Sequence, residues 1–119
     1  MTLDEYFAGR DDARAIFDAV SSAIDALGPA EVRVTKSQVA FRRRRTVAVV
    51  WTPDRYLSPE RSAPLVLTLS FPRRDPSPRW KGVTAVSPGR WTHHLELRSP
   101  GDIDAEVGAW LAEAWGAAG

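Results

Sequence analysis

The chain has 119 residues, 44% of them hydrophobic and 26% charged, with a formal net charge of +1, which is the composition of one average globular domain and excludes disorder. The absence of cysteine excludes disulfides, zinc–thiolate centres and thiol nucleophiles. No run of residues reaches the ~18 apolar positions of a membrane span, and the acidic start lacks the apolar stretch of a signal peptide, so we expect a cytoplasmic protein without membrane association.

Two helices are predicted ahead of the first strand. Residues 2–5 have the threonine-to-glutamate spacing of a capping box and open a short helix that Gly9 ends. A longer helix is expected at about residues 12–27, because its apolar residues recur three and four positions apart. Gly28 and Pro29 stop this helix, since glycine accepts a left-handed cap and proline cannot continue a helix.

After these helices the period of the apolar residues changes from about 3.6 to 2, which predicts strands. The clearest alternation occurs in the run of leucines that ends at Phe71 and in the run that contains both histidines. Prolines and glycines mark turns between the runs. We expect five or six strands, at residues 32–34, 39–41, 46–51, 65–71, 81–86 and 91–97.

A last helix is predicted to open at Ser99, followed by Pro100 in its first turn and by an apolar stripe from Ile103 to Ala114. Strands joined by short turns pair antiparallel, and a sheet with one apolar face needs cover. The sequence therefore predicts one α+β domain over residues 1–119, an antiparallel five- or six-stranded sheet with N- and C-terminal helices packed on one face. The other face, or a concavity in it, is the expected working surface.

The small net charge conceals a strong segregation. Residues 1–32 contain two basic and seven acidic side chains, residues 33–98 contain fourteen basic and four acidic ones, and residues 99–119 contain four acidic and no basic ones. A GC-rich genome explains why fourteen of the sixteen cations are arginine, but it does not explain why they gather in the middle. We therefore expect a basic sheet side opposite acidic helices.

No common catalytic motif is present: neither a nucleophile elbow, a P-loop, a dinucleotide fingerprint nor a zincin motif. His93 and His94 titrate near neutrality, but adjacent residues of a strand point to opposite faces and cannot chelate one ion together, so no metal site is expected. His93 shares a face with Trp91 and Leu95, which predicts a buried, hydrogen-bonded structural side chain; the alternative is that His93 binds a ligand or acts as a general base. His94 is either a ligand-binding residue or general base, or a plain cross-strand contact near Glu96.

Other candidate ligand-binding residues lie in the basic middle of the chain. Lys36, Arg43 and Arg45 offer positive charge, and Tyr56 with the tryptophans offers aromatic surface for stacking. In a strand, Arg43 and Arg45 would share one face, with Arg42 and Arg44 on the other. The alternative is that these cations are solvated, or protect a sheet edge, and that the tryptophans belong to the core.

Several stretches of the chain are similar to one known family: residues 3–7, 27–29, 35–45, 91–106 and 110–114. Together they resemble a small uncharacterised bacterial family, domain of unknown function 5655, over nearly the whole chain. The resemblance implies an α+β fold and no established reaction. It implies that Thr35, Lys36, Phe41, His93 and His94 recur in the family, which makes Phe41 a further candidate. Similar domains occur fused to nuclease-like modules, which favours a nucleic acid partner.

Three functions remain open. The first is a non-catalytic binding module whose basic sheet surface takes an anionic partner, either nucleic acid or a phosphorylated ligand. The second is a small-molecule pocket or an enzyme that uses His94 with Lys36. The third is a structural or protein-interaction domain. We favour binding, because no set of nucleophile, base and orienting group can be assembled from the sequence. No cofactor is expected, and the protein is expected to be a monomer or homodimer.

Overall fold

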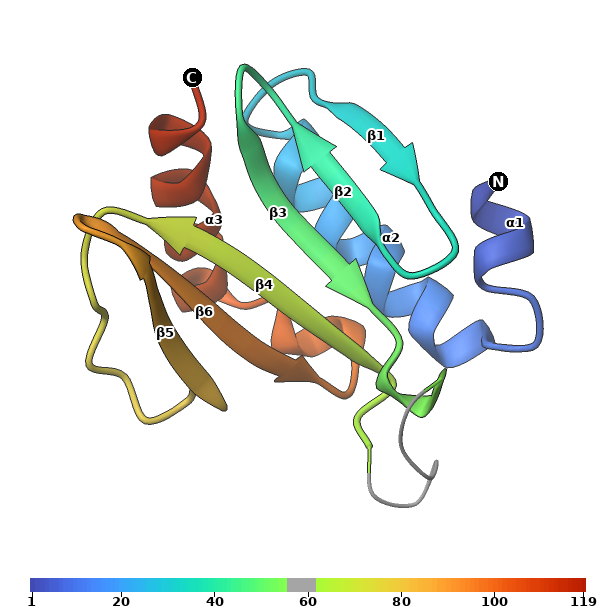
Figure 1. Cartoon of the computed structure of the whole chain (residues 1–119). Helices are drawn as coiled ribbons and strands as arrows, with labels where there is room; N and C mark the ends of the chain where they lie inside the picture. The colour runs from blue at the N-terminus through green and yellow to red at the C-terminus, as the bar shows by residue number, and fades with distance from the viewer. Residues whose placement is uncertain (56–61) are drawn as a thin grey trace.

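Three α-helices and six strands lie in residues 1–55 and 62–119, the part of the chain that the computed structural model describes (Figure 1). None of these helices is long and apolar enough to cross a membrane. The elements are α1 (Leu3–Tyr6), α2 (Asp11–Asp25), β1 (Glu31–Val34), β2 (Val39–Arg42), β3 (Thr46–Trp51), β4 (Leu65–Phe71), β5 (Gly82–Ser87), β6 (Arg90–Leu97) and α3 (Ala105–Ala117), with single 3-10 turns at Pro53–Arg55 and Pro100–Asp102.

The strands form one antiparallel sheet in the order β1-β2-β3-β4-β6-β5. Strands β5 and β6 form a hairpin whose second strand pairs with β4, so that β5 lies at the outer edge. Each observed strand agrees with its predicted range to within one residue at either end. The predicted α+β fold with an antiparallel sheet is confirmed.

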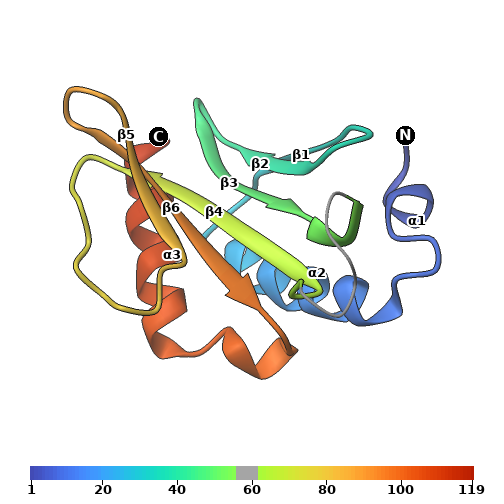
Figure 2. The same ribbon diagram turned by 60° about the horizontal axis from the view of Figure 1, so that its bottom comes forward.

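Helices α2 and α3 cover one face of the sheet and leave the other face open (Figure 2). The apolar stripe of α2 is buried between the helix and the sheet, as its spacing predicts. Along β4 the residues that face the helices are almost completely buried, whereas Thr68 and Ser70 on the open face are half-buried. Those helix-facing residues are Leu65, Leu67, Leu69 and Phe71. Alternation along the strands therefore separates the core from the open face.

The start of α3 differs from the prediction. Ser99 precedes the 3-10 turn, and Ile103 has ψ 72°, which is not helical and separates this turn from the helix. Helix α3 begins at Ala105 and is capped by Asp104, whose carboxylate accepts the backbone N–H of Val107 at 3.0 Å. The expected start of the last helix at Ser99 is therefore wrong. Ser99 caps only the 3-10 turn, and a separate capping residue, Asp104, begins the helix five positions later.

Gly28 lies in the loop between α2 and β1, at a point of close approach to α3. Its φ of +151° is a conformation that L side chains rarely adopt. A Cβ at this position would lie only 2.7 Å from Cζ2 of Trp115. The glycine that the sequence marks as a helix stop therefore also makes room for the indole of α3.

Candidate functional site

Antiparallel pairing brings three chain segments together at one end of the sheet, at the upper left of Figure 1. The β2–β3 turn, the end of β4 and the β5–β6 turn lie there, because the register pairs Arg42 with Thr46, Phe71 with Trp91, and Ser87 with Arg90. We call this the basic end, because its strand ends and adjoining loops carry seven arginines: Arg42, Arg43, Arg44, Arg45, Arg73, Arg74 and Arg90. The cations thus gather at one end of the sheet rather than along a face.

The β2–β3 turn is fastened to the C-terminal end of α3. Arg43 Nη1 donates to the carbonyl oxygen of Trp115 at 2.8 Å, and its guanidinium carbon lies 4.2 Å from the centre of a Trp115 ring. The backbone N–H of Arg45 donates to Ala118 O at 2.9 Å. Residues 43–45 form a turn between β2 and β3 and not a strand, so the alternation that a strand would impose on the four arginines does not apply. The side chain of Arg43 is therefore bound to α3. The side chain of Arg45 is exposed and makes no such contact with α3 among the described residues.

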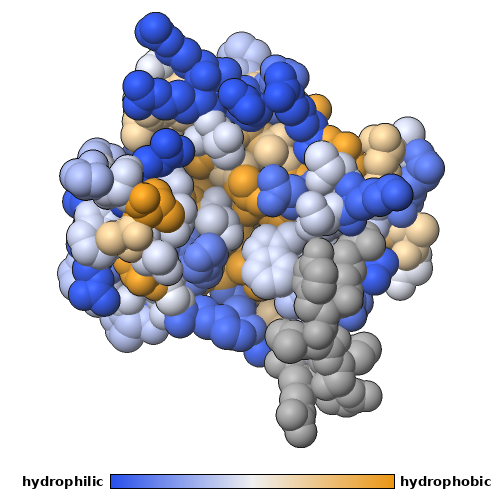
Figure 3. Space-filling view, in the orientation of Figure 1, coloured by the Kyte–Doolittle hydropathy of each residue, from blue (hydrophilic) through white to orange (hydrophobic). Residues whose placement is uncertain are grey.

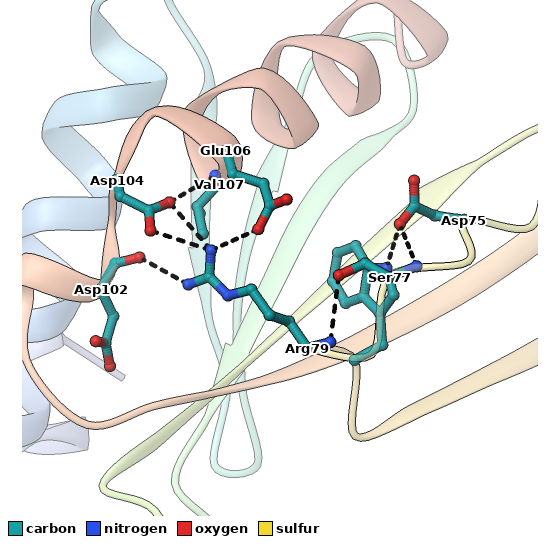
Figure 4. Close-up of polar contacts among 8 residues, drawn as sticks. Asp75, Ser77, Arg79, Asp102, Asp104, Glu106 and Val107 are labelled. Carbon is teal, nitrogen blue, oxygen red and sulfur yellow. Dashed lines mark hydrogen bonds and ion pairs between the residues drawn. The ribbon is translucent and has the colours of Figure 1, made fainter.

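The loop between β4 and β5 is also tied to α3, by ion pairs. Arg73 donates two hydrogen bonds, of 2.8 and 2.7 Å, to the carboxylate of Glu113 and a third, of 2.8 Å, to Asp75. Arg79 contacts the carboxylates of Asp104 and Glu106 at 3.1 and 2.8 Å (Figure 4). We call this loop and its partners the loop clamp. The loop clamp neutralises much of the charge that is segregated along the sequence, because its arginines pair with the carboxylates of the acidic C-terminal segment.

Asp75 is the centre of the loop clamp and keeps only 9% of its surface exposed. Its carboxylate accepts hydrogen bonds from Trp80 Nε1 at 2.9 Å, from Arg73, and from the backbone N–H of Ser77 at 3.1 Å. Burial by itself would raise the pKa of Asp75, but the hydrogen bonds from Trp80, Arg73 and Ser77 outweigh it and lower the pKa to about 2. Asp75 is therefore an ionised structural anchor.

His93 lies beneath this loop and is fully buried, as predicted. Its Nε2 accepts the backbone N–H of Asp75 at 3.0 Å, and its ring packs 4.2 Å from Phe71 and 4.9 Å from Trp80. Because Nε2 is an acceptor, the neutral ring carries its hydrogen on Nδ1. Nδ1 makes no hydrogen bond of good geometry within the described residues, although the backbone of Trp91 and of Leu69 lies close enough to favour the charged ring. Burial lowers the pKa of His93 and favours the neutral form.

His94 lies on the open face, half-buried, with Nδ1 2.9 Å from Thr68 Oγ1. Burial lowers the pKa of His94 as well. Lys81 is paired with the neighbouring Glu96 at 3.2 Å, so this part of the face carries little net charge. Figure 3 shows that the face is hollowed, with a largely hydrophobic floor and hydrophilic side chains around it. The part of the open face around His94 is therefore not strongly basic.

The remaining sequence candidates are not brought together. Lys36 is exposed in the β1–β2 turn, at the opposite end of the sheet, and β3 and β4 separate β2 from the strand of His94. Phe41 is buried in the core and stacks on Phe17 with ring centres 5.6 Å apart. Tyr56 lies outside the described residues.

Five of the seven arginines at the basic end form no ion pair with a carboxylate within residues 1–55 and 62–119: Arg42, Arg44, Arg45, Arg74 and Arg90. Of these, Arg42 lies opposite Glu31 in the pairing of β1 with β2, and its charge contributes to the lowered pKa of Glu31. Arg45 and Arg90 line a common groove with a volume of about 370 Å³. It lies where β3 and β4 separate, since their pairing stops at Ala48 and Leu69. These two guanidinium groups make the groove attractive to an anion.

Sequence reasoning missed Arg90 and Asp75. Arg90 follows a Ser-Pro-Gly turn that the sequence does reveal, but only the strand order shows that this turn faces Arg45. Asp75 lies in a proline-rich loop, and an aspartate there commonly accepts the backbone N–H two residues on, as it does from Ser77. That signal was available in the sequence.

Comparison with known proteins gives a family and no function. No curated protein and no solved structure matches the chain. The family model described as domain of unknown function (DUF5655) matches residues 3–118. The resemblance that the sequence motifs indicate is thereby confirmed, and the chain belongs to the DUF5655 family.

Proposed function

We propose that this protein is a non-catalytic binding module that takes an anionic partner at the basic end of the sheet. One observation carries the proposal: five arginines there form no ion pair with a carboxylate in the described part of the chain. In the same molecule, Arg73 and Arg79 are each paired with two carboxylates. Acidic partners are thus provided for the two arginines of the loop clamp and not for these five.

The basic end is also held in a defined shape. Arg43 and the backbone of Arg45 fix the β2–β3 turn on α3, and the β5–β6 turn is closed by the pairing of Ser87 with Arg90. Charged groups on a fixed backbone lose less conformational entropy when a ligand binds. This supports a binding role over a role in solubility alone.

Catalysis by His94 has weaker support. Thr68 and His94 form a hydroxyl–imidazole pair, but an activated nucleophile also needs a group that orients the imidazole. Among the described residues no side chain bonds His94 Nε2, and Lys36 lies at the far end of the sheet. A general base assisted by Lys36 is therefore not assembled.

The proposal is tested by anisotropy titrations of labelled single- and double-stranded oligonucleotides and of labelled polyphosphate. We expect binding at low salt that weakens steeply between about 50 and 200 mM salt, because bound cations release counterions. Arg44→Gln/Arg90→Gln should weaken binding, whereas Lys36→Gln/Arg98→Gln, which removes the same charge from exposed sites elsewhere, should not. Equal losses in both double variants would show that net charge alone is responsible and would contradict the proposal.

A further inference from the structure

The groove at the basic end exists because the sheet splits. Pairing between β3 and β4 runs from Trp51–Val66 to Ala48–Leu69, so Thr46 and Ser70 lie beyond the last paired residues. The register between β2 and β3 also shifts at this end, between Phe41 and Arg42. The split leaves the cavity of about 370 Å³ with one wall from the β2–β3 turn and another from the β5–β6 turn.

The groups that line this groove favour an anion. Arg45 belongs to one turn and Arg90 to the other, and both residues are exposed. Thr46, Ser70 and Ser87 also line the groove, and their hydroxyl groups can act as donors. No carboxylate lines the groove among the described residues.

We infer that the groove binds the phosphate group of a small phosphomonoester, an inference that rests on the proposed anion-binding function. The planar fork of arginine matches phosphate with two parallel hydrogen bonds, and two such forks from opposite walls match the charge of a terminal phosphate. The volume falls at the lower end of the range for small-molecule sites. Phe71, Pro72 and Pro88 provide apolar contact for the organic part of the ligand.

A small ligand is favoured over a nucleic acid by the surface beyond the groove. A polymer needs cations along its path. On the open face, however, Lys81 is paired with Glu96 and Arg33 with Glu31. Apart from Arg42, which belongs to the basic end itself, the strands between them present hydroxyl and apolar side chains on this face. Among the described residues, no unpaired cationic track therefore continues from the groove across the sheet.

The test uses phenyl phosphate, inorganic phosphate and a single-stranded oligonucleotide as probes, with binding measured by two-dimensional NMR shifts and calorimetry. We expect phenyl phosphate to shift the amides of residues 45–46 and 87–90. Arg45→Gln and Arg90→Gln should each weaken its binding about tenfold or more, as expected for the loss of a charge-assisted pair. Arg98→Gln, an exposed arginine outside the groove, is the matched control and should leave the affinity unchanged. The melting temperature shows whether each variant is folded. If one of the two groove variants does not fold, the other alone tests the site.

The outcomes separate the two proposals. Phosphate binding that Arg45→Gln and Arg90→Gln leave intact would overturn the groove as the site while anion binding stands. Salt-dependent oligonucleotide binding without phenyl phosphate binding would overturn the ligand class. If no anionic probe binds at low salt, the proposed function itself fails.

Discussion

Two arginine-rich regions of this protein, the loop clamp and the basic end, are built from the same residue type and behave differently. In the loop clamp, Arg73 and Arg79 contact the carboxylates of Asp75 and α3. The hydrogen bonds that Arg73 donates to Glu113 and that Arg79 donates to Glu106 raise the pKa of both guanidinium groups further above their ordinary value. At the basic end, Arg45 and Arg90 face a groove without any such partner in the described structure.

The difference shows that the role of an arginine here depends on what the fold places opposite it. A guanidinium that satisfies a buried carboxylate stabilises the fold, because an unpaired buried charge is costly. A guanidinium whose only partner is water contributes little to stability and remains available to a ligand. The comparison predicts opposite responses to mutation in the two regions.

The largest expected effect is at the centre of the loop clamp. Asp75→Ala removes the acceptor for Trp80, Arg73 and Ser77 and should lower the free energy of unfolding by about 3–5 kcal/mol. Urea denaturation provides the measurement. Asp75→Asn should cost less, since its amide oxygen still accepts from Trp80. A loss below about 1 kcal/mol for Asp75→Ala would mean that the loop is not anchored there.

The adjacent histidines come next. His93→Ala empties a site between Phe71 and Trp80 and orphans the backbone N–H of Asp75, so we expect a loss of about 2–4 kcal/mol. His94→Ala removes a half-buried side chain and its hydrogen bond to Thr68, and about 1 kcal/mol is expected. Melting temperatures that rank the two variants in reverse would refute these roles.

Acid should destabilise the loop clamp in two separate pH windows. The pKa of Asp75 is about 2 in the folded protein against 3.8 ordinarily, so its contribution is fully present above pH 4 and is lost as the pH falls toward 2, by about 2 kcal/mol in all. His93 has a lowered pKa, so protons favour the unfolded chain and stability begins to fall once the pH drops below about 6.5. Unfolding curves recorded against pH measure both contributions. Asp75→Asn should abolish only the lower window. A His93→Phe variant should reduce only the upper one, to which His94 also contributes because its pKa is lowered as well.

The smallest effect gives the sharpest comparison of the two regions. Arg73→Gln should lower the free energy of unfolding by about 1 kcal/mol. The substitution leaves Asp75 and Glu113 without their cation, but the effect is small because Arg73 is partly exposed. Arg45→Gln and Arg90→Gln should change stability by no more than about 0.5 kcal/mol. Anion binding should respond in the opposite sense, with Arg73→Gln unchanged. If all three variants lost stability equally, the basic end would be structural like the loop clamp.

Local patterns in the sequence determine which residues of this protein face inward. The alternation from Leu65 to Phe71 and the three-and-four spacing in α2 appear as buried faces, because a strand repeats every two residues and a helix every 3.6 whatever lies beyond them. The burial of His93 follows from the same alternation. The capping box at Thr2 and Glu5 is local too, and both of its hydrogen bonds are present.

The candidate site depends on which segments become neighbours, and only the tertiary structure decides this. The pairing of β4 with β6 places Thr68 beside His94, and the packing of α3 places Glu113 beside Arg73, forty residues away in the chain. The split between β3 and β4 brings Arg45 and Arg90 to one groove. Strand order and helix docking result from the free energy of burying the whole core, to which every element contributes. A local repeat therefore orients each side chain toward a face but cannot specify its partner across that face.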